Sequence, residues 1–285
     1  MKQAYVTKRL SRKRREMIER IDAIASEYTS KGIKITLRQC FYQLVSRSLI
    51  ENSETSYKKV SDLVSDGRMN GLLDWDTFED RTRYERSNTH WKSPQEILES
   101  AIHSYTIDTR VTQPYRLEAW IEKDSLIAIV EDIASRHDVT CFSCRGYPSV
   151  TSLHEAAMRI KADGRPCIIL YAGDHDPTGL RIPQIISEQL NIFGVCVNLE
   201  RIGLTLDQVR ELNLPPNRAK ESDGNFRWYV ENTGLETSWE LDGLPPERLA
   251  SIYEEAILRY TDLEQIAKMK EIENRDLYQL RRLIA

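Results

Sequence analysis

"PCIILYAGDHDPTGLRI", residues 166–182, joins a strand pattern to a helix pattern through two aspartates. The apolar run reads as a buried strand, and it leads directly into Asp174 and Asp176. The Pro-Thr-Gly that follows favours the start of a helix. Two like charges about 4 Å apart repel each other by roughly 4 kcal/mol at an effective dielectric constant near 20. We therefore expect a partner that compensates the two negative charges.

Strand and helix patterns alternate on both sides of this segment. Strands are expected in "YRLEAWIEK", "VTCFSCRGYPS" and "VCVNLERIGLT", and helices in "DSLIAIVEDIASRH", "VTSLHEAAMRIKADG" and "TGLRIPQIISEQLN", the last interrupted by Pro183. This alternation predicts an α/β fold with a mainly parallel, Rossmann-like sheet. Ligands bind such sheets at the carboxyl ends of the strands. Four residues of interest fall there: Glu122, Gly146, Asp174 and Asp176.

Three of these residues form a candidate metal site. Asp174 and Asp176 share a side if the strand persists that far, and otherwise they flank its tip. Glu122, at the end of another strand, completes a set of three carboxylates. Oxygen ligands without paired Cys or His favour Mg²⁺, or Mn²⁺, over zinc. The alternative is an ordinary acidic loop in which Asp176 caps the following helix.

Residues near this set have simpler expected roles. His175 should point to the opposite side and serve as a spacer. Glu240, in "WELDGLPPERL", could approach a metal from the tail, but we expect it to cap the start of a helix. Cys141 and Cys144 form a C-x-x-C without a second pair, so we interpret them as strand and loop residues, and all five cysteines as reduced thiols.

Positive charge is concentrated at the start of the chain. Residues 1–50 contain twelve Lys or Arg against four Asp or Glu, a balance of +8, whereas the whole chain carries −4, which leaves −12 for the remainder. This asymmetry suggests a basic domain that faces a polyanion, joined to an acidic domain. The alternative is that "RLSRKRREMIER" forms one solvated helix face.

The same basic region has the pattern of a winged helix-turn-helix. A helix is expected over residues 8–28, a second in "TLRQCFYQLVSRSLI" with Thr36 as N-cap, and a third in "SETSYKKVSDLVSDGRMNGLL", opened by Ser53 or Thr55. "GLLDWDTFEDRT" could supply a short wing. In such domains one helix lies against DNA. On the third helix the DNA-binding candidates are Lys58, Lys59 and Arg68.

Four segments follow from these patterns. We assign them as a basic helix with a winged-helix domain (1–85), a helical connector (86–114), a metal-binding sheet core (115–200) and a C-terminal extension of that core (201–285). The first residues lack the apolar stretch of a signal peptide, and no apolar run reaches the length of a membrane span. We therefore expect a cytoplasmic, nucleoid-associated protein with no membrane partner.

Three short motifs together resemble a known domain. "WIEKDS", "RGYPS" and "GDHDPTG" resemble the TOPRIM domain, with its Glu, its glycine turn and its D-x-D-x-x-G. The order of domains is similar to that of the A subunit of type IIB topoisomerases, which comprise topoisomerase VI and the related meiotic double-strand-break transesterases. In that family a catalytic tyrosine follows an arginine in the winged-helix domain, and "LRQCFYQL" places Tyr42 and Arg38 there. Many members have two adjacent tyrosines, whereas the first position here is Phe41.

The resemblance is closest to short, stand-alone A-like proteins, and it implies a mechanism. Tyr42 would attack a phosphodiester of double-stranded DNA and leave a 5′-phosphotyrosyl link, while Glu122, Asp174 and Asp176 hold Mg²⁺. It also implies a homodimer, in which the tyrosine of one chain meets the metal site of the other, and a possible ATPase partner of the GHKL type. Near the strand ends, Lys123 and Arg145 are candidate phosphate contacts.

Helical geometry distinguishes Tyr42 from its apolar neighbours. At 100° per residue, Tyr42 lies about 130° from the centre of the apolar stripe of its helix, and Arg38 lies on the same flank. A phenol with a pKa of about 10 is a weak nucleophile at neutral pH, and an adjacent guanidinium favours its phenolate. The alternative is a surface tyrosine on a DNA-binding helix.

Three other functions remain open from the sequence. A TOPRIM nuclease would use water as the nucleophile, with Tyr42 contacting DNA only. A DNA-binding partner subunit would have little activity of its own. A haloacid-dehalogenase-type phosphatase would also contain D-x-D-x-T, but its first aspartate opens the domain, whereas a strand, two helices and Glu122 precede Asp174 here.

Overall fold

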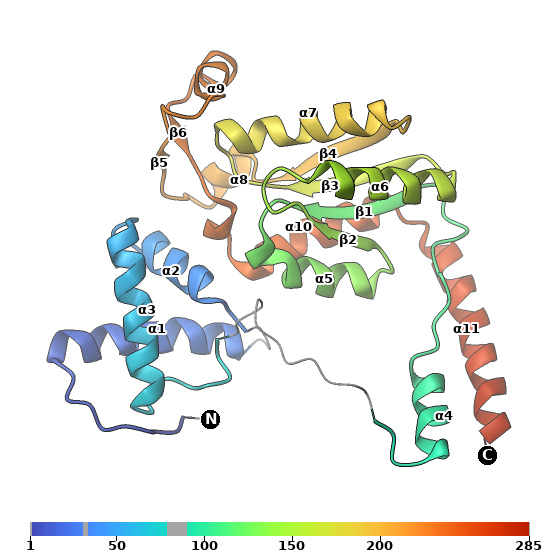
Figure 1. The fold of residues 1–285 in the computed structure, drawn as a ribbon, viewed down its shortest axis with the longest axis horizontal. Coiled ribbons are helices and arrows are strands. Elements are labelled where there is room, and N and C mark those ends of the chain that lie inside the picture. The colour runs from blue at the N-terminus through green and yellow to red at the C-terminus, as the bar shows by residue number, and fades with distance from the viewer. Residues whose placement is uncertain (1, 31–33, 79–89, 285) are drawn as a thin grey trace.

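A four-stranded parallel sheet forms the centre of the larger part of the molecule (Figure 1). The computed structural model describes residues 2–30, 34–78 and 90–284. The sheet has the order β2-β1-β3-β4, and every neighbouring pair is parallel. Its strands are β1 (Arg116–Ile121), β2 (Thr140–Ser143), β3 (Cys167–Ala172) and β4 (Val197–Gly203). The prediction of an α/β fold with a parallel sheet is confirmed.

Helices cover both faces of this sheet, because its central strands are apolar on both sides. In β3, Ile168 and Leu170 pack with one set of helices, whereas Ile169 and Tyr171 pack with the other. The first face is covered by α5 (Ile127–Arg136) and α10 (Pro246–Arg259), and the second by α6 (Val150–Asp163) and α7 (Pro177–Ile192). A sheet enclosed in this way presents its functional groups at the strand ends.

The proline within α7 does not interrupt the helix, contrary to our expectation. α7 is continuous from Pro177 to Ile192. Pro183 has no N–H to donate to the carbonyl of Gly179, one turn earlier. That carbonyl instead accepts a hydrogen bond from Arg201 Nη1, at 2.9 Å. The arginine of β4 therefore replaces the missing helical donor.

Three helices form the N-terminal region: α1 (Arg12–Thr29), α2 (Leu37–Ser46) and α3 (Glu54–Met69). Side-chain oxygens of Ser11, Thr36 and Ser53 cap them, and both Thr36 and Ser53 had been predicted as N-caps. The three helices share one apolar core, separate from the cores on either side of the sheet. Its largest wholly buried members are Ile18, Ile21, Tyr28, Ile35, Leu44 and Leu73.

The predicted wing lies partly outside the described residues. From Gly71 to Phe78 the chain forms turns and one isolated parallel bridge, Ile35 with Phe78. Within 2–30 and 34–78 the only other bridge joins Ala4 to Asn70. The rest of the expected wing, residues 79–82, falls in the undescribed segment. Of the predicted winged-helix domain, the structure therefore describes the three helices and the turn that follows α3.

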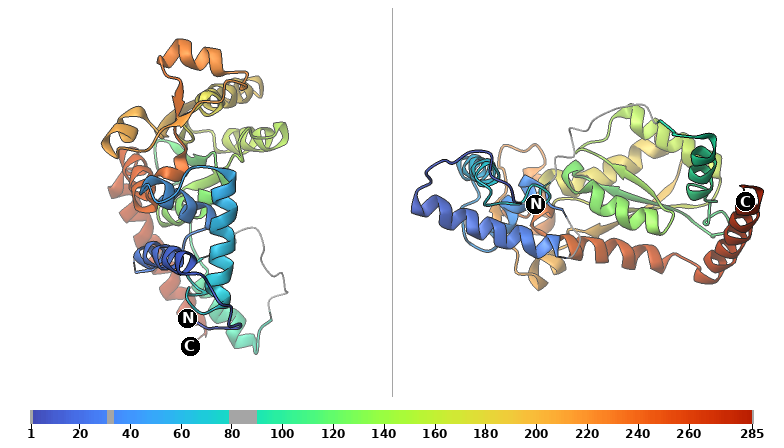
Figure 2. Two further views of the ribbon diagram at one scale, coloured as in Figure 1. Left: turned by 90° about the vertical axis from the view of Figure 1, so that its left-hand side faces the viewer. Right: turned by 90° about the horizontal axis from the view of Figure 1, so that it is seen from below.

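The connector and the end of the chain lie together, far from the N-terminal helices. Within the expected connector, α4 (Pro94–His103) is helical and residues 104–114 are irregular. α4 packs against α11 (Leu263–Ile284), and Tyr105 Oη donates to Asp276 Oδ2 at 3.2 Å. Figure 1 and the right-hand view of Figure 2 place these helices at the end of the molecule opposite α1–α3.

The tail after β4 returns to the strand ends before it forms α10. It contains α8 (Leu206–Glu211), the short antiparallel pair β5 (Asn217–Arg218) and β6 (Thr237–Ser238), α9 (Phe226–Thr233) and the 3₁₀ turn η2 (Leu241–Gly243). α2 contacts η2, so this tail joins the two regions of the molecule. In the described part of the chain, no helix is both long and apolar enough to cross a membrane.

Candidate functional site

The predicted carboxylates meet at the carboxyl ends of β1 and β3. Glu122 follows β1, and its side-chain Oε2 accepts a hydrogen bond from the backbone N–H of Asp174, at 3.0 Å. A side chain at Gly173 would collide with the same oxygen, so a larger residue at this position would displace the Glu122 carboxylate. Burial raises the pKa of Glu122, and the nearby charge of Asp176 raises it further. The two strand ends are thus connected through one carboxyl group.

Asp174 and Asp176 flank the tip of β3, which ends at Ala172. Asp174 is buried, and its Oδ1 accepts from the backbone N–H of Leu241 at 2.7 Å. Asp176 is the N-cap of α7, and its Oδ1 accepts from the N–H of Gly179 at 2.6 Å. Burial raises the pKa of both carboxyl groups, that of Asp174 strongly. Asp176 therefore has the capping role considered above and also lies beside the other acids.

Two further carboxylates reach this point from η2. Glu240 was expected to cap a helix, which is wrong: its side chain makes no capping hydrogen bond and instead pairs with Lys123. Asp242 is wholly buried, and Ser125 Oγ donates to its Oδ1 at 3.2 Å. We call these five residues the acidic cluster: Glu122, Asp174, Asp176, Glu240 and Asp242.

Lys123 supplies positive charge inside the acidic cluster. Its Nζ lies 2.9 Å from Asp174 Oδ2 and 2.8 Å from Asp242 Oδ2, and it also pairs with Glu240. Burial lowers the pKa of the ammonium group, but these carboxylates outweigh burial and raise it well above its usual value. Lys123 had been predicted as a phosphate contact. In the structure it compensates negative charge at Asp174, for which the sequence analysis had expected a partner.

Arg201 holds the loop that carries the aspartates, and sequence reasoning missed it. Its Nη2 donates to the carbonyls of Gly173 (2.8 Å) and Asp174 (2.6 Å), while Nη1 reaches Gly179 as described above. Arg201 is paired with Tyr171 in the register of β3 and β4. One guanidinium thus fixes the backbone on both sides of Asp176.

His175 points into the tail, as expected for a spacer between the aspartates. Tyr229 Oη donates to the carbonyl of Thr237 at 2.6 Å, so it accepts from His175 Nδ1 at 3.1 Å. The ring also packs edge-on against Trp239, whose backbone bridges to that of His175. Burial lowers the pKa of His175 to about 4.

Tyr42 and Arg38 lie next to the acidic cluster of their own chain. The Tyr42 ring centroid is 5.8 Å from Lys123 Nζ and 5.9 Å from Arg38 Cζ. Arg38 Nε lies 3.7 Å from Asp242 Oδ2. Burial raises the pKa of Tyr42, as does the charge of Glu240, whereas Lys123 and Arg38 oppose them. The family resemblance implies that the tyrosine of one chain meets the metal site of a second chain, and a single chain does not test this. Within one chain, Tyr42 and Arg38 already lie beside the acidic cluster.

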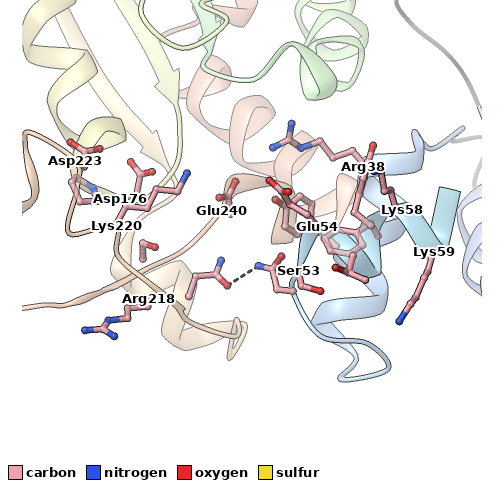
Figure 3. A pocket seen from close by; sticks show the side chains of 18 of the residues that line it. Arg38, Ser53, Glu54, Lys58, Lys59, Asp176, Arg218, Lys220, Asp223 and Glu240 are labelled. Carbon is pink, nitrogen blue, oxygen red and sulfur yellow. Dashed lines mark hydrogen bonds between the residues drawn. The ribbon is translucent and has the colours of Figure 1, made fainter.

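A cleft of about 1030 Å³ opens beside these residues, between the N-terminal helices and the tail. Figure 3 shows Arg38, Lys58 and Lys59 on one wall and Lys220, Arg218 and Asp176 on the other, with Glu240 between them. Asn52 Nδ2 donates to Asn217 Oδ1 across the cleft at 2.7 Å. Sequence reasoning had named Lys58 and Lys59 but had missed the basic residues of the tail.

Two predicted DNA contacts lie outside this cleft. Arg68 donates to the carbonyls of Trp75 (2.9 Å) and Phe78 (2.7 Å), so it fixes the turn after α3. Arg145 is largely exposed and pairs with Asp124 at 3.0 Å. Arg145 and Gly146 both have positive φ, 54° and 82°, which makes the glycine turn after β2 a sharp one.

The donor chemistry of the acidic cluster fits a hard cation. As the side chains stand, no group of three or more His, Cys, Asp or Glu in the described residues is placed to hold a metal ion. The cluster nevertheless offers carboxylate oxygens only, the ligands that Mg²⁺ and Mn²⁺ prefer. Asp242 Oδ2 is buried, and its nearest positively charged group is the Lys123 ammonium group, 2.8 Å away. The residues present therefore fit such an ion.

Comparison with known proteins adds no assignment. No protein-family model matches the sequence, and no curated protein matches it.

Proposed function

We propose that this chain is a Mg²⁺-dependent DNA-cleaving enzyme in which Tyr42 is the nucleophile. One observation carries the proposal: Tyr42 and Arg38 line one basic-rimmed cleft together with Asp176 and Glu240 of the acidic cluster, although they come from segments far apart in the sequence. The motif resemblance to type IIB topoisomerase A subunits supports it. In this proposal residues 1–85 form a winged-helix domain, and the parallel sheet with its acidic loops forms a TOPRIM domain.

The reaction is a transesterification. The Tyr42 oxygen forms a bond to the DNA phosphorus, and the bond from phosphorus to the 3′ oxygen of the neighbouring nucleotide breaks. This leaves a 5′-phosphotyrosyl link and a free 3′ hydroxyl. Glu240, the carboxylate with the largest electrostatic effect on Tyr42, takes the phenolic proton and returns it to the leaving 3′ oxygen. Arg38 contacts the phosphate under attack.

Glu122, Asp174 and Asp176 are the residues that would hold the metal ion. When bound, Mg²⁺ or Mn²⁺ would neutralise negative charge on the phosphate during the reaction. Exposed lysines on both walls of the cleft, Lys58, Lys59 and Lys220, contact the flanking phosphates. A break in both strands requires two such sites, so we propose a homodimer on double-stranded DNA, with a GHKL ATPase as a possible further subunit.

A hydrolytic nuclease is the second candidate. The observation that favours it is the raised pKa of Tyr42, because a phenol that ionises less readily is a poorer nucleophile. In that case water attacks the phosphate, the acidic cluster and its metal are still needed, and Tyr42 contacts DNA only. The two candidates differ in whether the protein becomes covalently attached to DNA.

Substitution of Tyr42 by Phe separates the two candidates. Wild type, incubated with Mg²⁺ or Mn²⁺ and duplex DNA labelled at a 3′ end, should give a labelled adduct that survives denaturant and disappears with protease. Tyr42→Phe should bind the DNA equally well and give neither adduct nor break. Tyr57→Phe is the matched control, because Tyr57 lines the same cleft from α3 and should cleave as wild type does.

Each outcome of this experiment is decisive. Cleavage by Tyr42→Phe near the wild-type rate would exclude the tyrosine as nucleophile and leave the nuclease. A strand labelled at its 5′ end should be released from wild type with a 3′ hydroxyl and no attached protein. Attachment of the protein to that fragment would contradict the polarity proposed here.

A further inference from the structure

Lys123 is positioned as the main counter-ion of the acidic cluster. It follows Glu122 at the end of β1, and only 11% of its side chain is exposed. Its ammonium group contacts Asp174, Glu240 and Asp242, which come from the β3 loop and from the tail. A single side chain therefore joins two separate parts of the acidic cluster.

The alternatives to Lys123 as a source of charge are weak. Arg38 Nε is 3.7 Å from Asp242 Oδ2, and half of its side chain is exposed to water. Arg201 makes its hydrogen bonds to backbone carbonyls rather than to the carboxylates. The Lys123 ammonium group, 2.8 Å away, is closer to Asp242 Oδ2 than the Arg38 guanidinium is. Without Lys123, the charges of Asp174, Glu240 and Asp242 would face one another in a largely dry site, which is costly.

We propose that Lys123 is an internal substitute for the divalent cation, and that the cation binds by displacing the lysine ammonium from Asp174, Glu240 and Asp242. The inference rests on the metal site of the proposed function and adds its regulation. Asp174 is both a contact of Lys123 and a proposed ligand of the cation, and two positive charges cannot share it closely, because like charges a few ångströms apart repel strongly. Cation affinity is therefore set by how firmly the lysine is held.

The exchange also links the cation to the tyrosine. Lysine has a flexible four-carbon stem, so its ammonium group can leave the carboxylates without movement of β1. Its Nζ is already 5.8 Å from the ring centroid of Tyr42, a residue that lines the cleft. A displaced Lys123 lies on the side of the cleft where a DNA phosphate would bind, so metal binding delivers a positive charge next to the nucleophile.

Calorimetric titration of the full chain with Mg²⁺ and with Mn²⁺ tests the exchange. Lys123→Met keeps the length of the side chain and removes its charge, so it should bind the cation at least about tenfold more tightly than wild type. Lys123→Arg keeps the charge and should bind no more tightly than wild type. Lys268→Met, on α11, removes a surface lysine paired with Glu264 and should leave the affinity unchanged.

Thermal unfolding gives a second readout that is independent of activity. Without metal, Lys123→Met should unfold at a lower temperature than wild type, and added Mg²⁺ should raise its midpoint by more than it raises that of wild type. If the single variant does not fold, Lys123→Met/Glu240→Gln removes one charge of each sign and serves in its place.

The outcomes separate this inference from the proposed function. Equal or weaker cation binding by folded Lys123→Met overturns the role of Lys123 and leaves the metal site intact. Absence of cation binding in wild type and in every Lys123 variant overturns the metal site and the exchange together. Tighter binding by Lys123→Met, with an affinity in Lys123→Arg no higher than that of wild type, is the result that the exchange requires.

Discussion

The two halves of the candidate site are held in place by different means. On the sheet side, Glu122 and Asp174 are tied to each other through a backbone hydrogen bond, and Arg201 holds the carbonyls of the same loop. On the helical side, Tyr42 belongs to a ten-residue helix that has its own core. The contacts between the halves are made by side chains, among them Asn52 with Asn217 and Arg38 with Asp242.

Because of this difference, the carboxylates are pre-organised by the sheet, whereas the position of the tyrosine can adjust. The carboxylates are built into the ends of buried parallel strands, so their geometry changes only if the sheet changes. The tyrosine lies beside the acidic cluster, but its helical region is joined to the sheet side partly by exposed polar contacts such as that of Asn52 with Asn217, and each such contact contributes little to stability. The geometry of the candidate site is thus fixed on the acidic side and set by the position of the helical region on the tyrosine side. Three substitutions test this contrast.

Arg201→Met should have the largest effect. It removes the donors that three backbone carbonyls of the aspartate loop use, which should lower the free energy of unfolding by about 3 kcal/mol or more. Urea unfolding followed by circular dichroism measures this. Arg227→Met, which breaks an exposed pair with Glu231 on α9, is the control and should change stability by about 0.5 kcal/mol or less. Similar effects of the two variants would refute a rigid acidic side.

The sheet side should also lose stability in acid through His175. Its pKa is about 4 when folded and about 6.5 when unfolded, so the unfolded chain binds more protons between these values. Stability is therefore complete above about pH 6.5 and falls as the pH drops towards 4. Between pH 7.5 and pH 5 the loss should be about 2 kcal/mol.

His175→Gln isolates this contribution, because the nearby carboxylates titrate alike in variant and wild type. The variant should lose less stability than wild type over the same pH range in urea unfolding. His103→Gln, at an exposed position on α4, should keep the wild-type slope. No histidine lies within residues 1–85, so the helical region cannot contribute to this difference. If the free energy of unfolding of His175→Gln changed with pH as steeply as that of wild type, protonation of His175 would not destabilise the folded protein.

Asn52→Ala should have the smallest effect. It removes an exposed amide hydrogen bond across the cleft, so unfolding should become easier by about 1 kcal/mol or less. Asn232→Ala, which loses a hydrogen bond within α9, is a matched control in urea unfolding. A loss as large as that of Arg201→Met would mean that the cleft is fixed as firmly as the aspartate loop.

The sequence predicted the acidic side well because buried parallel strands leave long apolar runs. The run at 167–172 ends where the aspartates begin, and Glu122 ends a similar run, so topology alone brings them together. The starts of α2 and α3 could also be predicted, since Thr36 and Ser53 are residue types that cap helices well. These features depend on residues close together in the chain or on a general rule of sheet architecture.

The rest of the site depends on side chains that meet only in three dimensions. Asp242 and Glu240 lie in a loop more than 60 residues after Asp174, and no periodic pattern directs that loop to the strand ends. From the sequence, Lys123 was predicted to contact a phosphate, and its pairing with those carboxylates is seen only in three dimensions. The position of Tyr42 beside the acidic cluster depends in turn on the contact between α2 and η2.

The proline inside α7 has a consequence for how reliably the sheet is assembled. Pro183 leaves the Gly179 carbonyl without a helical donor, and Arg201 supplies one only when β4 is aligned with β3 as observed. A slip of one residue would turn Arg201 to the opposite face of the sheet, leaving a carbonyl unpaired and a charge misplaced. The missing helical donor in α7 therefore favours the observed register of the edge strand, because a misaligned β4 would leave the Gly179 carbonyl without a donor.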